Sequence, residues 1–263
     1  MDHLTLEQRG GVLVITLDRP ERRNAMTPQM TQALTQALAT AASDDAVRAV
    51  MLTGAGGHFC VGGDVKAMNE GSGQDRSLGE RIHALRDRMS AAQYLHMMPK
   101  PTIAAIEGSA AGAGLSLALA CDLRICADDS RLTTAFAKVA LSGDFGGSYF
   151  LSRILGPARA REHYLLSPVL DGASAARIGL VTQSVPAGEV QQTALDLALR
   201  LAAGPTLTYA RIKQNLTLAA EGAPLSACLD LEAANHTTAA MTEDHREAAA
   251  AFVEKRQPVF RGR

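Results

Sequence analysis

The sequence carries almost no net charge and has no long apolar run. Its 26 Lys and Arg residues nearly balance 27 Asp and Glu residues, which leaves a net charge of −1. Without a strong field of one sign, we expect neither nucleic acid nor a membrane surface as a partner. The longest apolar-rich run, residues 108–120, is too short to cross a bilayer, and charged residues interrupt the N-terminal segment too often for a secretory signal.

Cysteine motifs are also missing. The four cysteines form no CxxC pair, and no histidine lies near them at zinc spacing. We therefore expect no metal site. Cys121 and Cys126 fall in an apolar run and are predicted to be buried thiols, with a reducing cytoplasm as the expected compartment.

Three familiar catalytic and nucleotide-binding signatures are absent. The chain has no GxxxxGK[ST] phosphate loop and no complete GxGxxG fingerprint, which argues against a P-loop enzyme and a dinucleotide-binding protein. It also lacks the GxSxG turn of an α/β-hydrolase, and Ser116 has no evident partner in sequence.

What the sequence does contain is an alternation of strand and helix signals. A β-branched run at residues 11–17 is followed by a helical pattern with Thr27 as its N-cap and Pro28 at its first position, and a second strand pattern begins near residue 47. This succession predicts an α/β fold with a largely parallel sheet.

Strand signals stop after about residue 195. Three helices are predicted beyond it, over residues 193–204, 206–222 and 225–256. We therefore expect a core domain over residues 1–195 and a C-terminal helical region over residues 196–263. So few helices have little core of their own, so this region should pack on the main domain or on another subunit.

Two glycine-rich turns each follow a predicted strand, at residues 53–65 and 107–122. Small residues allow close approach to the backbone, and the second turn opens a helix, whose first N–H groups have no partner within the helix. Such turns are often only packing devices. Two of them in one domain can also each supply one N–H to a single oxygen, which is an oxyanion hole.

Five motifs in order resemble the crotonase family, the enoyl-CoA hydratase/isomerase superfamily: RPERRNAM, GHFCVGGDV, KPTIAAIEGSAAGAGLSLALACDLRICADD, DFGGSYFLSRILG and ARIGLVTQSVP. The resemblance implies a crotonase-like spiral of ββα units with a C-terminal all-helical trimerisation region, assembled as a homotrimer or dimer of trimers. It implies an acyl-CoA thioester as substrate and no cofactor, with coenzyme A present only as part of that substrate. It also implies that the amides of Gly63 and Ala113 bind the thioester oxygen, with Val61, Gly62 and Gly112 beside them.

The chain departs from the family at the acid–base positions. Where a hydratase of this family carries two glutamates, this sequence has Ser116 and Phe136. Asp144 stands two residues before Gly146-Gly147, and several isomerase-like members of the family carry a catalytic aspartate in a similar D-x-G-G context. Asp144 is thus the candidate acid/base. The alternative from residue type alone is that Asp144 caps the helix that begins near Gly146.

The other candidate residues have supporting roles. Phe136, Phe145, Tyr149 and Phe150 are expected to line a pocket that raises the pKa of Asp144 by desolvation. Tyr149 is expected either to donate a hydrogen bond to the acyl group or to serve only as a packed aromatic. Residues 68–93 are expected to shape acyl specificity. Asp64 and Glu107 are expected to brace the loops. By resemblance, Arg22, Arg23, Lys255 and Arg256 occupy positions that touch the CoA phosphates.

Three functions follow from these expectations. A double-bond isomerase needs one base that removes a proton at C2 and returns it at C4, and a single carboxylate suffices. A hydratase or another lyase or hydrolase acting on an unusual acyl-CoA would need water activated by Asp144 or Glu107. A catalytically inactive acyl-CoA-binding protein would keep the fold without its acids. The isomerase is the favoured prediction.

Overall fold

The computed structural model describes residues 3–64 and 77–263. Its main sheet has the strand order β1-β2-β3-β4-β6-β8, in which β1 and β2 are antiparallel and the remaining pairs are parallel. A small parallel sheet pairs β5 with β7. The strands are β1 Leu4–Arg9, β2 Val12–Leu17, β3 Ala49–Gly54, β4 Thr102–Ile106, β5 Ser109–Ala111, β6 Leu123–Ala127, β7 Arg131–Thr133 and β8 Gln183–Val185.

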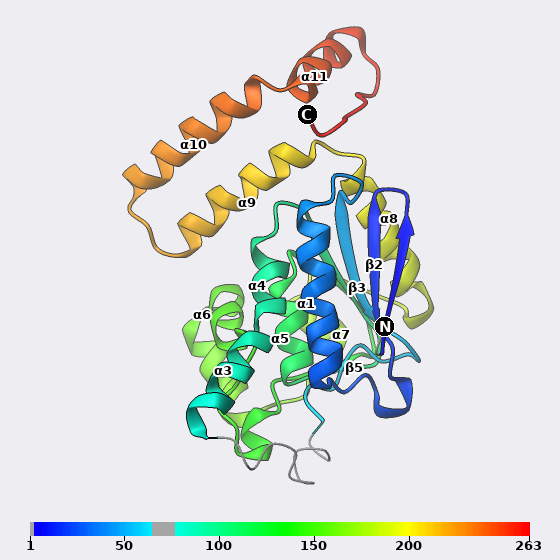
Figure 1. Cartoon of the computed structure of the whole chain (residues 1–263), viewed down its shortest axis with the longest axis vertical. Coiled ribbons are helices and arrows are strands. Elements are labelled where there is room, and N and C mark those ends of the chain that lie inside the picture. The colour runs from blue at the N-terminus through cyan, green and yellow to red at the C-terminus, as the bar shows by residue number, and fades with distance from the viewer. Residues whose placement is uncertain (1–2, 65–76) are drawn as a thin grey trace.

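Helices cover both faces of the main sheet (Figure 1). The helices are α1 Pro28–Ser43, α3 Leu78–Arg88, α4 Ser90–Met97, α5 Ala113–Ala120, α6 Gly147–Leu166, α7 Gly172–Arg177, α8 Val190–Ala202, α9 Thr206–Ala220, α10 Leu225–Ala240 and α11 Glu243–Glu254. Short 3₁₀ turns occupy Pro20–Arg22, Phe136–Val139 and Ala187–Glu189.

Alternating residues of the central strands pack into two separate hydrophobic cores, one on each face of the sheet. Ile15 and Leu52 belong to the larger core, where α1, α4 and α5 pack. Val14 and Met51 point to the opposite face, which α8 covers with a row of small residues such as Ala194. Because side chains of a strand alternate between faces, both sides of each central strand are buried and the sequence of these strands is largely apolar.

The C-terminal helices extend away from the sheet domain. In Figure 1, α9 runs along the upper end of the sheet domain, while α10 and α11 project beyond it. An ion pair of 2.7 Å between Lys213 Nζ on α9 and Asp122 Oδ2 ties α9 to the core. At the chain end, Asp244 on α11 accepts the backbone N–H groups of Arg261 and Gly262 and holds the tail in place.

The predicted elements are largely present. Thr27 accepts the N–H of Met30 as the N-cap of α1, with Pro28 at its first position. The expected domain boundary at residue 195 falls inside α8, which packs on the sheet, so the helices that leave the core begin with α9. The long helix predicted over residues 225–256 is wrong: it ends at Ala240, and Thr242 caps a new helix by accepting the N–H of His245.

β1 was not predicted, and it pairs with β2 along its whole length. Cys121 and Cys126 are buried free thiols, as expected. Across residues 3–64 and 77–263, none of the helices is long and apolar enough to span a bilayer.

Candidate active site

The two glycine-rich turns are held together by backbone hydrogen bonds. Cys60 N donates to Ser109 O at 3.1 Å, and Ala111 N donates to Cys60 O at 2.9 Å. A methyl group at Gly62 would lie 2.9 Å from Ala111 O and 3.2 Å from Ala113 N. Gly62 also has a φ of +90°. Only glycine fits this close approach without strain.

This contact brings Gly62, the residue before Gly63, next to the amide of Ala113. Ala113 opens α5, so its N–H has no partner within the helix. Among the described residues, no acceptor is present for the N–H of Ala113 or for that of Gly63. Val61, Gly62 and Gly112 lie directly beside them in the chain. The arrangement offers two donors, one of them at the positive end of a helix dipole, to a carbonyl oxygen on which negative charge develops.

Polar side chains fix the first of these turns. Asn24 Nδ2 donates to Ala55 O at 2.9 Å and to His58 O at 2.7 Å. Arg19 Nη1 donates to Asp64 Oδ2 at 2.8 Å in a largely buried ion pair. Asp64 thus braces the loop, as the sequence predicted.

Asp144 lies in the turn that precedes α6. Its backbone O accepts the N–H of Gly147 at 3.1 Å. Its side chain does not cap the helix: the N-cap is Gly146, with no side-chain hydrogen bond. The alternative role as a helix cap is therefore wrong. Asp144 Oδ1 is buried and has no hydrogen-bond partner among the described residues.

The environment of Asp144 makes its carboxylate a stronger base than usual. Burial raises its pKa to about 6, and the positive charge of Arg88 at the end of α3 opposes this rise. At neutral pH such a carboxylate is mostly ionised yet more basic than an exposed aspartate, as a general base requires. Burial also raises the pKa of the Cys60 thiol to about 12, with Asp144 contributing to the rise, so Asp144 lies within electrostatic range of the first glycine turn.

Ser116 and Phe136 are the residues at which the resemblance implies glutamates in a hydratase. Ser116 is 2% exposed, and its Oγ donates to Gly112 O at 3.2 Å. The Phe136 ring is 5% exposed and stacks on the ring of Tyr164, with centroids 5.8 Å apart. A methyl group at Gly112 would lie 3.8 Å from the Phe136 ring. An aromatic wall therefore stands beside the second turn in place of a carboxylate.

The other expected pocket aromatics differ in orientation. Phe145 and Phe150 are buried. The Tyr149 ring packs edge-on against His96, at 5.9 Å between centroids, and lies 3.5 Å below the guanidinium carbon of Arg153. These contacts hold the ring between α4 and its own helix, as expected for a packed aromatic.

The positions that resemble CoA-phosphate contacts are not brought together in one chain. Arg23 is exposed, and its backbone O accepts the N–H of Val61 at 3.2 Å, which places it at the edge of the first glycine turn. Lys255 follows the last residue of α11. That helix lies at the opposite end of the molecule from β5 (Figure 1). Lys255 is thus no part of this site within one chain, because α9, α10 and α11 carry it away.

Glu107 serves the scaffold. Its Oε2 accepts a hydrogen bond of 2.5 Å from Gln191 Nε2 on α8, and its backbone O accepts the N–H of Phe59. These two contacts agree with the bracing role expected for Glu107. Within the described ranges, no group of three His, Cys, Asp or Glu side chains is placed to hold a metal ion.

Sequence reasoning missed Arg88 and Tyr164. Arg88 falls in the segment expected to shape the acyl pocket, of which residues 68–76 lie outside the described residues and residues 78–88 form α3. Tyr164 stands 20 residues after Asp144, in the middle of a helical pattern. No motif or spacing connects either residue to Asp144, because their contacts depend on how α3 and α6 pack.

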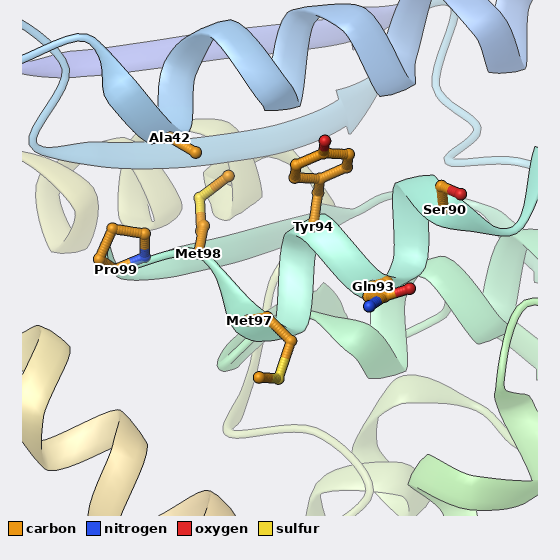
Figure 2. Close-up of a pocket in the computed structure, with 7 residues that line it drawn as sticks. All are labelled: Ala42, Ser90, Gln93, Tyr94, Met97, Met98 and Pro99. Atoms are coloured by element: carbon orange, nitrogen blue, oxygen red, sulfur yellow. The ribbon is translucent and has the colours of Figure 1, made fainter.

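A surface hollow of about 390 Å³ lies away from these residues, between the end of α1 and α4 (Figure 2). It contains no ionisable group that acts at neutral pH and none of the residues of the glycine turns. Because it lacks an acid or base that works at neutral pH, this hollow is not the candidate reaction site. Its lining consists of Ala42, Ser90, Gln93, Tyr94, Met97, Met98 and Pro99.

Comparison with known proteins agrees with this geometry. The family model for enoyl-CoA hydratase/isomerase matches residues 7–263. A protein named 1,2-epoxyphenylacetyl-CoA isomerase from Escherichia coli is 36% identical over the full length of both chains. A probable enoyl-CoA hydratase from Rhodobacter capsulatus is 38% identical over 96% of this chain and 95% of its own.

The fold has a counterpart among solved structures as well. A putative enoyl-CoA hydratase from Streptomyces coelicolor superposes with a TM-score of 0.94 at 37% identity, over 99% of this chain and 94% of that one. The sequence match, the shared fold and the paired glycine turns lead to one assignment. The chain belongs to the enoyl-CoA hydratase/isomerase family and has the crotonase fold.

Proposed function

We propose that the protein is an enoyl-CoA isomerase that moves a double bond from the 3,4 to the 2,3 position of an acyl-CoA. The amides of Gly63 and Ala113 hold the thioester oxygen. Asp144 removes a proton from C2, and the resulting dienolate carries its negative charge on the oxygen bound by the two amides. The protonated Asp144 then returns the same proton to C4, so the carboxylate is regenerated and no other reactant is needed.

The observation that carries this proposal is the buried Asp144 carboxylate, one oxygen of which has no hydrogen-bond partner among the described residues. Asp144 has a buried, unpartnered oxygen and a pKa raised by burial to about 6. The two positions where hydratases of the family carry glutamates hold Ser116 and Phe136, and neither can act as a carboxylate base. A single proton carrier is sufficient for isomerisation, whereas addition of water normally uses two poised groups.

The proposal includes no metal or redox cofactor. Coenzyme A enters only as part of the substrate, and the negative charge is stabilised by backbone amides. We further propose a homotrimer or a dimer of trimers as the assembly. The exposed apolar side chains of the projecting helices support it, since a monomer would leave them in water.

The test is turnover of trans-3-hexenoyl-CoA by the wild type and by Asp144→Asn. We expect the variant to lose about 10²–10⁴-fold in kcat/KM, the usual contribution of a positioned acid/base. The wild-type rate should fall as the pH drops below about 6, where Asp144 becomes protonated. Asp129→Asn, at an exposed carboxylate in the β6–β7 turn, is the matched control and should keep wild-type rates. An Asp144→Asn enzyme with wild-type activity would exclude Asp144 as the base.

Hydration is the second candidate, because the Rhodobacter capsulatus relative is named a probable enoyl-CoA hydratase. Asp144 would then activate water beside the two amides, while Glu107 accepts a hydrogen bond from Gln191. Hydration of crotonyl-CoA faster than isomerisation of trans-3-hexenoyl-CoA would favour this reaction. Binding of both thioesters without turnover of either would instead indicate an inactive acyl-CoA-binding protein.

A further inference from the structure

The hydroxyl of Ser116 is a buried polar group to which the proposed reaction gives no task. Ser116 lies near the start of α5, is 2% exposed and has a single side-chain proton to donate. That proton goes to Gly112 O, which lies 3.2 Å from Ser116 Oγ. The backbone N–H of Ser116 donates to the same oxygen at 3.0 Å. The carbonyl of Gly112 thus accepts two hydrogen bonds from one residue.

The carbonyl that accepts these two bonds belongs to a peptide group of the candidate oxyanion hole. Gly112 C=O and Ala113 N–H are the two ends of one peptide group, because Ala113 follows Gly112 in the chain. Resonance couples the two ends of a peptide group. A donor at the oxygen therefore polarises the group and makes its N–H a stronger donor in turn. Ser116 acts in this way on the Ala113 amide without touching the substrate.

The same peptide group is held in a fixed direction. The N–H of Gly112 donates to Thr133 O at 3.1 Å, so the residue is tied to the end of β7 on one side and to Ser116 on the other. Ala113 N is the next atom in this chain of bonds, and it opens α5. The direction of its N–H is therefore set before a substrate binds, as stabilisation of a developing oxyanion requires.

Tyr164 is the neighbour of the Ser116 hydroxyl. A methyl group at Gly147 would clash with both Ser116 Oγ and the Tyr164 hydroxyl, so the two oxygens lie side by side beneath this glycine. Burial and then the charge of Asp144 raise the pKa of Tyr164 to about 12, and a hydrogen bond with Ser116 opposes the rise. Tyr164 keeps its proton at neutral pH. Because the proton of Ser116 goes to Gly112 O, the oxygen of Ser116 is left to accept from Tyr164.

We propose that Ser116 is a positioning residue that strengthens the Ala113 end of the oxyanion hole by donating its hydroxyl proton to Gly112 O. The proposal rests on the proposed function, because it takes the amides of Gly63 and Ala113 as the position of the thioester oxygen. It gives a task to the side chain at which the resemblance implies a glutamate in a hydratase. The opposing explanation is a serine that only bonds back to its own helix, as serines in helices commonly do.

The experiment measures the polarisation of the bound thioester. Difference infrared spectra of hexanoyl-CoA, isotopically labelled at the thioester carbonyl, are recorded for the wild type, Ser116→Ala and Thr35→Val. This thioester has no carbon–carbon double bond to move, so its carbonyl stretch does not depend on whether Asp144 is the base. Thr35→Val is the matched control, since it removes a hydroxyl that donates at 2.9 Å to Thr31 O, four residues earlier in α1.

Binding to the wild type should move the carbonyl stretch to lower frequency, as for an oxygen that accepts two strong hydrogen bonds. We expect a smaller shift in Ser116→Ala and the wild-type shift in Thr35→Val. With trans-3-hexenoyl-CoA, kcat of Ser116→Ala should fall roughly 2- to 8-fold at a nearly unchanged KM, because polarisation strengthens a donor by roughly a tenth to a third and loss of a whole donor costs about 10²–10³-fold in rate.

A carbonyl shift in Ser116→Ala equal to that of the wild type would overturn the proposal, since it is the result for a hydroxyl that only supports the helix. Absence of any shift in the wild type would also overturn it, together with the placement of the thioester at the two amides. Wild-type activity of Asp144→Asn, with the carbonyl shifts as expected, would overturn the isomerase proposal alone.

Discussion

The environment of Asp144 lowers stability and suits its proposed role as the base. An aspartate at the surface would be fully solvated, but this one has a buried oxygen with no partner among the described residues. Burying a carboxylate favours its neutral form, and Arg88 only partly offsets this effect. Groups of this kind concentrate at functional sites, where the fold tolerates an unfavourable environment because the reaction needs it.

This environment predicts a pH-dependent cost in stability. The pKa of Asp144 is about 6 in the folded state, against an ordinary value of 3.8 for an aspartate. Between these values the folded protein binds the proton more tightly than the unfolded chain, so the contribution of Asp144 to stability falls as pH rises from about 4 to 6 and stays low above. We expect Asp144→Asn to be more stable than the wild type at pH 8, by at most about 3 kcal/mol.

Urea denaturation of both proteins at pH 8 and pH 4.5 measures this difference, which should shrink at the lower pH. Asp64→Asn is the opposing control. Its carboxylate forms an ion pair of 2.8 Å with Arg19, so its removal should destabilise the protein at pH 8. A loss of stability in Asp144→Asn at pH 8 would contradict the assignment of Asp144 as an unpaired, desolvated acid.

At the scale of elements, the site depends on the meeting of two turns from separate strand–helix units. One turn follows β3 and the other links β5 to α5. Their backbones touch at Gly62, where no side chain fits beside Ala111 O. The position of each amide is therefore set by the other turn as well as by its own sequence, and one added methyl group should disturb both.

Gly62→Ala and Gly57→Ala test this dependence as a pair. Both glycines have a positive φ, +90° and +73°, so both substitutions impose left-handed strain of about 1–2 kcal/mol. A methyl group at Gly62 would lie 3.2 Å from Ala113 N, whereas one at Gly57 meets nothing within 4 Å. We expect Gly62→Ala to lose more than ten-fold in kcat/KM and Gly57→Ala to stay near wild type. Equal activity of the two variants would show that the close contact does not position the amides.

Local signals in the sequence predicted local structure well. Thr27 with Pro28 marks the start of α1, and the apolar runs mark β2 and β3, because a cap or a buried strand is encoded by adjacent residues. The break after Ala240 was missed even though Thr242 is a typical cap. Its signal is weak, since alanines and threonines continue the helical pattern on both sides.

Features that depend on packing could not be predicted in the same way. The family resemblance identified Asp144, but residue type alone favoured a helix cap, and only the position of α6 shows that its side chain caps nothing. The position of the Tyr164 hydroxyl beside Gly147 and Ser116 became visible only in the structure. Such contacts join distant segments, and neither periodicity nor spacing encodes them.

At the scale of the whole molecule, the C-terminal helices expose large apolar side chains to solvent. They project from the sheet domain (Figure 1), and neither α9 nor α10 has a buried residue. Large apolar side chains on them are open to water, among them Leu216 at 65%, Leu225 at 73%, Phe252 at 86% and Val253 at 79% exposure. Clustered exposure of this kind marks an interaction surface.

This exposure predicts self-association through the C-terminal helices. Covering apolar side chains in an interface gains free energy for each area removed from water, so the wild type should have a mass well above the 27.6 kDa of one chain. Light scattering coupled to size exclusion, at micromolar protein, measures this mass.

The double variant Phe252→Glu and Val253→Lys should shift the population to smaller species without changing the helical circular dichroism signal. Leu78→Lys, at a residue 74% exposed on α3, controls for a new surface charge and should keep the wild-type mass. A wild type that is monomeric under these conditions would show that the projecting helices remain uncovered in solution, and the trimeric assembly would have to be abandoned.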